Sequence, residues 1–294
     1  MEQKWKKWTG VVLFLMLVAV AVCYLYVQPT MAHTTYETIK ATILKVGKAD
    51  AIIVESPYQT MVIDCGEEDD GPEVVQFLQN RAIETIDVLI ITHFDKDHVG
   101  GADQVIEQFD VKRVLVPDYD STSTEYLDFV VAMQAKGITP ERLRETVTFT
   151  IGDAEVIVDA PLDYGILEAV KTDETLEVDN DLSLITTIIH GDNRMVFAGD
   201  AEKMRLREWL ATENAQPCDF LKIPHHGVFN TEMEILSTQL APTYTAICTS
   251  AKNPADAQTV EIFKRNGANV LETKDGDIVV MSNGRLIEVA QAAR

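Results

Sequence analysis

The sequence predicts an α/β fold in which two β-sheets and the helices that cover them form one large domain. Short apolar runs such as Val88–Ile91 alternate with segments of helical periodicity such as Pro72–Ala82, and these two periods are typical of strands and amphipathic helices. Hydrophobic residues make up 46% of the 294 residues, so the chain can bury a core of the size that such a fold requires.

The N-terminal segment, residues 1–32, predicts a membrane anchor. Three lysines precede residue 8, and Gly10–Val27 is an uncharged apolar run whose length as a helix approaches the roughly 30 Å hydrocarbon core. The positive flank places the N-terminus in the cytoplasm and the domain on the extracytoplasmic side, as a single-pass protein of the cell membrane. The alternative is a signal peptide cleaved near Ala32, after Thr30-Met31-Ala32, which would secrete the domain.

Strands are expected wherever a short apolar or alternating run ends at Gly, Pro or Asp. The expected strands are Ile39–Val46, Ala51–Glu55, Thr60–Ile63, Val88–Ile91, Arg113–Pro117, Val147–Ile151, Glu155–Ala160, Leu184–Ile189, Met195–Phe197, Phe220–Ile223, Tyr244–Thr249, Val270–Glu272 and Ile278–Met281.

Helices are expected between these strands, where apolar residues recur at helical spacing. The expected helices are Pro72–Ala82, Ala102–Phe109, Glu125–Lys136, Glu202–Leu210, Glu232–Leu240 and Ala255–Asn266. An acidic segment between Asp163 and Asp181 interrupts the alternation and is expected to be a lid or a solvated surface loop. No linker divides residues 36–290, which we interpret as one domain.

The loop after Val88–Ile91 has the composition of a metal site. Two histidines and two aspartates, His93, Asp95, Asp97 and His98, fall within six residues, just before Gly100-Gly101. Imidazole and carboxylate are ligands that zinc and similar divalent ions prefer, and a loop at a strand end can direct consecutive side chains to one point. Two later strands end in the same residue types, at Asp200 and at His225-His226.

The spacing of these residues resembles the metallo-β-lactamase superfamily, and within it the hydrolase domain of the ComEC-type competence proteins, which also has an aspartate at the position of Asp95. Further similar segments are Val46–Ala51, Val62–Gly66, Asn180–Leu184 and Leu221–Gly227. The resemblance implies a four-layer αβ/βα sandwich with its ligands at one edge of the two sheets. It also implies a binuclear metal-dependent hydrolase whose two divalent ions are zinc, with manganese as the alternative.

The resemblance also implies a role for each site residue. His93, Asp95 and a bridging Asp200 would hold the first ion, with Asp181 or water as a further ligand, and Asp97, His98 and His225 would hold the second. Asp97 is expected to orient the attacking hydroxide. His226 is expected either to contact the ligands without binding an ion itself or to donate a proton. Asp50 and Asp64 are expected to support the metal loop by hydrogen bonds, and Cys65 to be a metal neighbour or a small buried residue.

The chain departs from the ComEC-type pattern at two positions. No histidine occurs in Asn180–Leu184, as in that group, but a further histidine expected near Asn253-Pro254 is also missing, and Val228 replaces a serine. The missing histidine leaves the source of the leaving-group proton open.

The net charge of −22 makes extended nucleic acid an unfavourable partner, because binding polyanions requires basic patches. A small anionic or phosphoester substrate is therefore expected: a nucleotide, a short oligonucleotide or a cell-envelope phosphodiester. Two alternatives stay open. The first is an amide, ester, lactone or lactam hydrolase of the same fold, and the second is a membrane-tethered binding module with a degenerate metal site.

Overall fold

The computed structural model describes Met16, residues 35–165 and residues 179–292. Contacts divide the chain into a unit of residues 1–35 and a unit of residues 36–294. Among the residues that the structure describes, no helix combines the length and the apolar character needed to cross a membrane. The run Gly10–Val27, on which the anchor prediction rests, lies outside the described residues except for Met16.

The first sheet of the larger unit has eight strands and is mixed. The antiparallel strands β1 and β2 lie next to β3, which begins a parallel series through β5, β7 and β8. In sheet order the strands are β17 (Ile287–Ala292), β16 (Asp277–Ser282), β1 (Ile39–Ile43), β2 (Ala51–Glu55), β3 (Thr60–Cys65), β5 (Val88–Ile90), β7 (Val114–Pro117) and β8 (Glu141–Leu143).

The second sheet has seven strands and is also mixed. Its central strand β12 is antiparallel to β11 and parallel to β13, so the chain direction changes there. In sheet order the strands are β15 (Asn269–Glu272), β14 (Tyr244–Ile247), β13 (Phe220–Lys222), β12 (Asn193–Phe197), β11 (Ile185–His190), β10 (Ala154–Asp159) and β9 (Val147–Ile151). A separate pair of short strands is formed by β4 (Thr85–Ile86) and β6 (Asp110–Val111).

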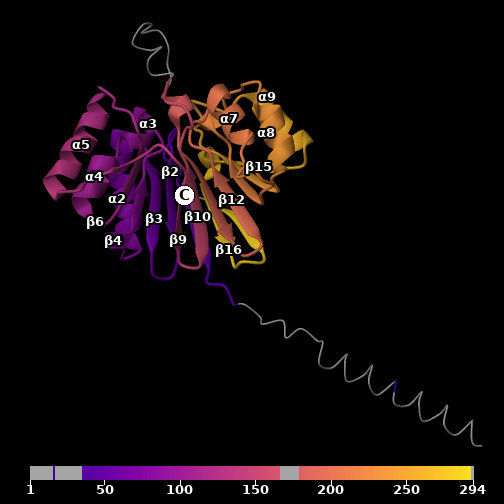
Figure 1. Cartoon of the computed structure of the whole chain (residues 1–294), viewed down its shortest axis with the longest axis horizontal. Coiled ribbons are helices and arrows are strands. Elements are labelled where there is room, and N and C mark those ends of the chain that lie inside the picture. The colour runs from indigo at the N-terminus through magenta and orange to yellow at the C-terminus, as the bar shows by residue number, and fades with distance from the viewer. Residues whose placement is uncertain (1–15, 17–34, 166–178, 293–294) are drawn as a thin grey trace, which may run out of the picture. The chain divides into compact units, whose positions relative to one another are not determined.

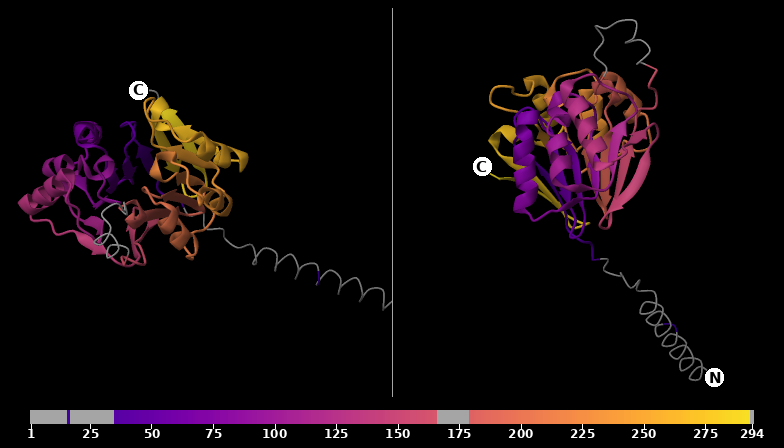
Figure 2. Two further views of the ribbon diagram at one scale, coloured as in Figure 1. Left: turned by 90° about the horizontal axis from the view of Figure 1, so that it is seen from above. Right: turned by 90° about the vertical axis from the view of Figure 1, so that its left-hand side faces the viewer.

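Helices cover the outer face of each sheet, and the two sheets face each other (Figures 1 and 2). The helices α2 (Gly71–Asn80), α4 (Ala102–Gln108) and α5 (Thr124–Lys136) pack on the first sheet, and α7 (Lys203–Leu210), α8 (Met233–Leu240) and α9 (Ala257–Arg265) on the second. Three buried apolar clusters fill the spaces between the four layers. The predicted αβ/βα sandwich is therefore confirmed.

The strand β12 illustrates why these sequences form buried strands. Its residues Met195 and Phe197 face the core between the two sheets, whereas Val196 faces the core under α7 and α8. A strand that is buried on both faces has a continuous apolar run instead of alternation. Such strands end abruptly at the polar loops that carry the candidate ligands.

Gly100 and Gly101 allow close packing behind the metal loop. A Cβ atom on Gly100 would lie 2.5 Å from the backbone nitrogen of Glu68, and one on Gly101 would lie 2.5 Å from the carbonyl oxygen of Cys65. Both distances are shorter than van der Waals contact, so only glycine permits α4 to begin against the end of β3. The glycines thus fix the metal loop relative to the first sheet.

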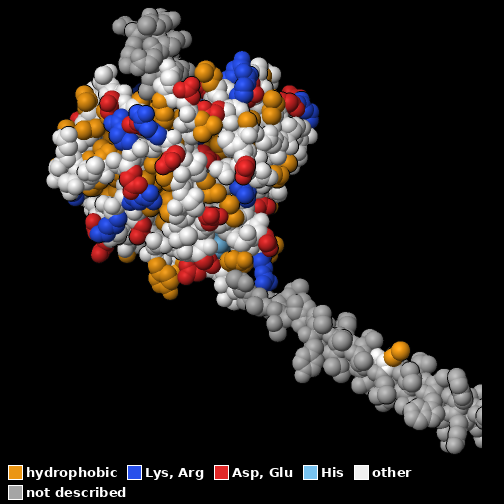
Figure 3. Space-filling view, in the orientation of Figure 1, with side chains coloured by type: hydrophobic (Ala, Val, Ile, Leu, Met, Phe, Trp, Pro, Cys, Tyr) orange, Lys and Arg blue, Asp and Glu red, His pale blue; other side chains and the backbone are white. Residues whose placement is uncertain are grey.

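Acidic and basic side chains are interspersed in small groups on the face of the domain drawn in Figure 3. Several of the basic side chains are paired: Arg142 contacts Asp118 and Asp120 at 2.7 Å each, and Arg113 contacts Glu141 at 2.7 Å. Such pairing reduces the positive charge that these arginines present to solvent.

Candidate metal centre

The loop after β5 leads into the short helix α3 (Lys96–Val99), which presents Asp97 and His98 from one turn. Asp95 precedes this helix in extended conformation, and its Oδ2 lies 3.6 Å from Nε2 of His93. The rings of His93 and His98 are 4.1 Å apart, and both side chains are buried. The structure thus brings together all four residues of the loop that the sequence singled out.

Asp64 holds the ring of His98 in position. Its Oδ2 lies 2.8 Å from Nδ1 of His98 and accepts a 2.7 Å hydrogen bond from the Thr92 hydroxyl, while Oδ1 accepts one from the Thr92 amide. A proton on Nδ1 leaves Nε2 as the free ligand atom, an arrangement common behind metal-binding histidines. Asp64 adopts a left-handed backbone conformation, with φ of 58°, at the end of β3. It therefore has the supporting role that was expected for it.

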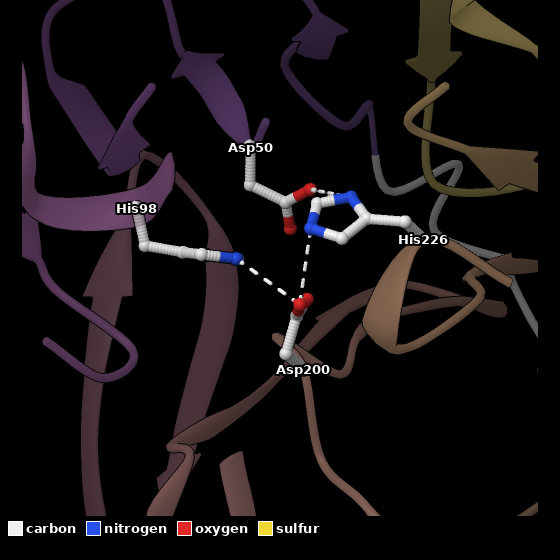
Figure 4. A group of neighbouring side chains, drawn as sticks. All are labelled: Asp50, His98, Asp200 and His226. Atoms are coloured by element: carbon white, nitrogen blue, oxygen red, sulfur yellow. Dashed lines mark ion pairs between the residues drawn. The ribbon is translucent and has the colours of Figure 1, made fainter. Parts of the chain in front are cut away.

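Four buried side chains from separate segments converge at the edge where the sheets meet: Asp50, His98, Asp200 and His226 (Figure 4). One ligand atom of each lies within 4.8 Å of the others. Oδ2 of Asp200 lies 3.0 Å from Nε2 of His226 and 3.3 Å from Nε2 of His98. Asp97 joins this group, because its Oδ2 lies 3.2 Å from Nε2 of His226.

The electrostatics of this cluster follow from its acidic surroundings. Burial by itself would lower the pKa of His98, but the carboxylates of Asp200 and Asp64 outweigh it and raise that pKa. Burial would raise the pKa of Asp200, whereas His226, His98 and Lys222 hold it well below its usual range. Without metal, the carboxylates therefore favour protons on the imidazoles of His98 and His226, and a bound cation must displace those protons.

His225 and His226 point in different directions. Both residues have left-handed backbones, with φ of 48° and 51° in the turn η3 (His225–Gly227), so the chain reverses between the two side chains. His226 enters the cluster and its Nδ1 lies 3.1 Å from the carbonyl oxygen of Cys248. His225 instead places its Nδ1 2.8 Å from Oε1 of Glu202.

This geometry makes His226, and not His225, the candidate ligand of the two. The structure places His226, and not His225, at ligand distance from Asp97 and Asp200. Nδ1 of His226 is engaged by the carbonyl oxygen of Cys248, and its Nε2 faces Asp200, so His226 has the position of a candidate ligand, and its expected role as a proton donor stays a prediction.

Lys222 is a site residue that the sequence interpretation did not identify. It lies on β13, is fully buried, and contacts Oδ2 of Asp50, Oδ1 of Asp200 at 3.3 Å and the carbonyl oxygen of Gly199 at 2.9 Å. The available signal was a single lysine in the buried strand Phe220–Ile223, since charged residues are almost never fully buried unless they are paired.

Two other expected site residues, Asp181 and Cys65, are not part of the cluster. Oδ1 of Asp181 accepts hydrogen bonds from the amides of Met204 and Arg205 at the start of α7, so this carboxylate caps a helix. Cys65 belongs to the apolar core beneath the helices of the first sheet. Most of the acidic segment that was considered as a lid, residues 166–178, lies outside the described residues.

The donor set fits a divalent cation. The Nε2 atoms of His93, His98 and His226 are buried and make no hydrogen bond of normal geometry. Each faces a carboxylate oxygen at 3.0 to 3.6 Å, a spacing that an ion between them would bridge. Imidazole nitrogens and carboxylate oxygens suit zinc and manganese, so the residues that the structure brings together can hold such an ion.

We expect Asp64→Asn to weaken metal binding about 10- to 100-fold, because the asparagine amide cannot hold the His98 ring in the required tautomer as a carboxylate does. Isothermal titration with zinc or manganese measures the change. Asp87→Asn provides a matched control, since Asp87 also accepts a backbone hydrogen bond, from Thr60, but lies away from the cluster. Equal affinities in Asp64→Asn and the wild type would contradict the supporting role.

Two curated proteins are similar to this chain. ComE operon protein 3 of Bacillus subtilis is 26% identical over 252 residues, which are 78% of this chain and 31% of that protein. Recombination protein 2 of Haemophilus influenzae is 23% identical over 216 residues, 72% of this chain and 24% of that protein. The chain therefore spans about a third of the length of the first and a quarter of the second. These matches confirm the similarity to the ComEC type.

A solved structure and a family model define the fold and the family. The metallo-beta-lactamase fold protein YhfI from Bacillus subtilis superposes with a TM-score of 0.52 at 10% identity, covering 86% of this chain and all of that one. The model of the metallo-beta-lactamase superfamily matches residues 44–251, which include every residue of the cluster. Together with the αβ/βα sandwich and the convergent histidines and aspartates, this match means that the chain belongs to the metallo-beta-lactamase superfamily.

Proposed function

We propose that this protein is a metal-dependent hydrolase that cleaves phosphoester bonds of small anionic substrates. The observation that carries the proposal is the convergence of His98, Asp200 and His226 with Asp97, from loops of both sheets, at one buried point. Asp97, His98, Asp200 and His226 would hold one divalent ion, and His93, Asp95 and Asp200 the other. Zinc is favoured, and the oxygen ligand Asp95 makes manganese the alternative.

Each residue would have a defined task in the reaction. Divalent ions in such a site polarise the scissile group and acidify water. Burial would raise the pKa of Asp97, but its contacts with His226 and His98 outweigh burial and lower that pKa, so Asp97 stays ionised. It would accept a hydrogen bond from the attacking group. Asp64 keeps His98 in the binding tautomer, and the buried walls of the site limit access of bulk water.

The phosphoester class is supported by charge and by the curated relatives. A net charge of −22 disfavours long polyanions, whereas two divalent cations would offset about four charges locally and admit a small anion. A nucleotide, a short oligonucleotide or a cell-envelope phosphodiester meets this condition. The similarity to a ComE operon protein and to a recombination protein is consistent with a nucleic-acid fragment as substrate.

The basic start of the sequence and the apolar run Gly10–Val27 support a location on the extracytoplasmic side of the cell membrane. The alternative is a secreted domain released by cleavage near Ala32. Protease added to intact cells should digest an anchored domain at the outer surface, and protection from the protease would contradict the outward orientation.

A non-catalytic binding module is the second candidate, and one observation favours it. Asp181 caps α7 and is therefore not free to act as a ligand. Of the residues proposed for it, an ion at His93 and Asp95 would then have only the shared Asp200 as a further ligand. The alternative substrate class for an active enzyme is an amide, ester, lactone or lactam. Both alternatives keep the fold and differ in the chemistry of the site.

The deciding experiment uses the full chain, freed of metal and then loaded with zinc or manganese. Its metal content is measured together with the hydrolysis of bis-p-nitrophenyl phosphate. Metal-dependent turnover that disappears in His98→Ala supports the phosphoesterase. Bound metal with turnover of ester or lactone substrates alone would shift the class to carbonyl chemistry, and the absence of bound metal would favour the binding module.

A further inference from the structure

Lys222 is a buried cation in direct contact with the candidate ligands. The residue belongs to β13, in the middle of the second sheet between β12 and β14. Its side chain is fully buried, and its Nζ contacts two carboxylates, Asp50 and Asp200, and the carbonyl oxygen of Gly199. An ammonium group inside a sheet is strongly unfavourable unless such partners compensate for its lost hydration.

The buried carboxylates of the cluster are also unfavourable unless positive charge compensates for their lost hydration. Asp50, Asp64 and Asp200 are all buried, at 2% exposure or less. Within the described part of the cluster, Lys222 is the one side chain whose positive charge does not depend on a titrating imidazole. Its Nζ lies between Asp50 and Asp200, so the charges of the ammonium and of the two carboxylates compensate one another.

Lys222 also divides the two oxygens of Asp200 between different partners. Oδ1 lies 3.3 Å from Nζ of Lys222, whereas Oδ2 lies 3.0 Å from His226 and 3.3 Å from His98. The ammonium thus fixes the rotation of the carboxylate and leaves Oδ2 facing the histidines. Asp50 is held in the same way, through its Oδ2.

We propose that Lys222 is a positioning residue that acts as a built-in cation of the metal centre. It neutralises Asp50 and Oδ1 of Asp200, so the site is assembled before metal binds. The assembled site offers the ion only Oδ2 of Asp200. The inference rests on the metal-binding part of the proposed function. It implies that Lys222 and a bound metal ion compensate for the same negative charges. Removing the lysine should therefore make the protein more dependent on metal.

The test compares wild type and Lys222→Met as full chains, each stripped with chelator and then titrated with manganese or zinc. In Lys222→Met, the apo melting temperature should fall by roughly 10 °C, because two buried carboxylates lose their partner. The metal-induced rise in melting temperature should be larger than in wild type. The affinity for the ion should increase at least about tenfold, because a neighbouring positive charge is gone and carboxylate oxygens become available.

Arg205→Met is the matched control. Arg205 is also a buried cation, but it contacts the carbonyl oxygens of Ser183 and Asp159 and the carboxylate of Glu208 instead of the cluster. Its loss should lower the melting temperature of the apo and the metal-loaded protein equally. A lysine with a purely structural role would behave like this control, so equal losses with and without metal in Lys222→Met would overturn the proposal.

A second variant covers the case in which Lys222→Met does not fold without metal. Asp50→Asn/Lys222→Met removes one carboxylate together with the cation, and its apo melting temperature should lie well above that of Lys222→Met. An apo protein no more stable than Lys222→Met would overturn the proposal. A wild type that binds no metal would instead contradict the proposed function itself, so the two failures are distinguishable.

Discussion

Asp200→Asn is expected to abolish metal binding at both positions and to reduce hydrolysis by at least about a thousandfold. Asp200 is the residue on which the centre converges, since its Oδ2 faces His98 and His226 and its Oδ1 faces Lys222. Asparagine keeps the shape but lacks the negative charge that would neutralise two cations and bridge them. Metal content by mass spectrometry and turnover of bis-p-nitrophenyl phosphate measure the two effects.

Asp159→Asn is the control for this prediction. Asp159 is a buried carboxylate at the end of β10, with hydrogen bonds from Thr146, Trp209 and Asn214, and it lies outside the cluster. Its substitution should lower the stability of the protein and leave the metal content per folded chain unchanged. An Asp200→Asn protein that retains both ions would show that the convergence at Asp200 is not the metal centre.

The candidate ligands that could be identified from the sequence follow short buried strands, whereas Asp50 comes directly before β2 and Lys222 lies within β13. Val88–Ile91 and Met195–Phe197 are apolar on both faces, and Phe220–Ile223 is apolar except for Lys222, so the ends of these strands are visible as the polar residues that follow. In a two-sheet sandwich, such ends can meet at one edge, and the structure brings those of β5, β12 and β13 together.

The directions of individual side chains could not be predicted in the same way. The left-handed backbone at His225 and His226 decides which ring enters the site, and the enrichment of histidine in that conformation is too weak to predict it at two given positions. Asp181 had the chemistry of a ligand but serves as a cap of α7, a role that depends on where the helix starts in space. The contact of Lys222 with Asp50 joins residues of different sheets, and no local pattern predicts such a contact.

The two edge strands of the first sheet were not predicted. β17 alternates Ile287 and Val289 with exposed residues, and β8 is only three residues long, at Glu141–Leu143. Both lie at the two ends of the first sheet, where one face or one edge is open to solvent and the apolar signal is weak. The metal centre does not depend on either strand, which is why its location could be inferred without them.

His226→Ala is expected to remove the ion held by Asp97, His98 and Asp200, whereas His225→Ala should keep it. The reason is the turn at η3, which places Nε2 of His226 at 3.2 Å from Asp97 and 3.0 Å from Asp200 but directs His225 to Glu202 at 2.8 Å. His226→Ala should therefore weaken metal binding by about 100-fold or more, since a neutral donor with two carboxylate neighbours is lost from the coordination sphere.

The pair of variants is internally controlled, because the two histidines are adjacent and the substitutions are identical. His225 is also the more exposed of the two, with 18% of its side chain accessible against 1% for His226, so its loss should disturb packing less. Titration of both variants with manganese or zinc, with the melting temperature followed in parallel, separates lost coordination from lost stability. Metal loss in His225→Ala with retention in His226→Ala would mean that the turn adopts the opposite arrangement when the ion binds, and would restore the assignment that the sequence resemblance implied.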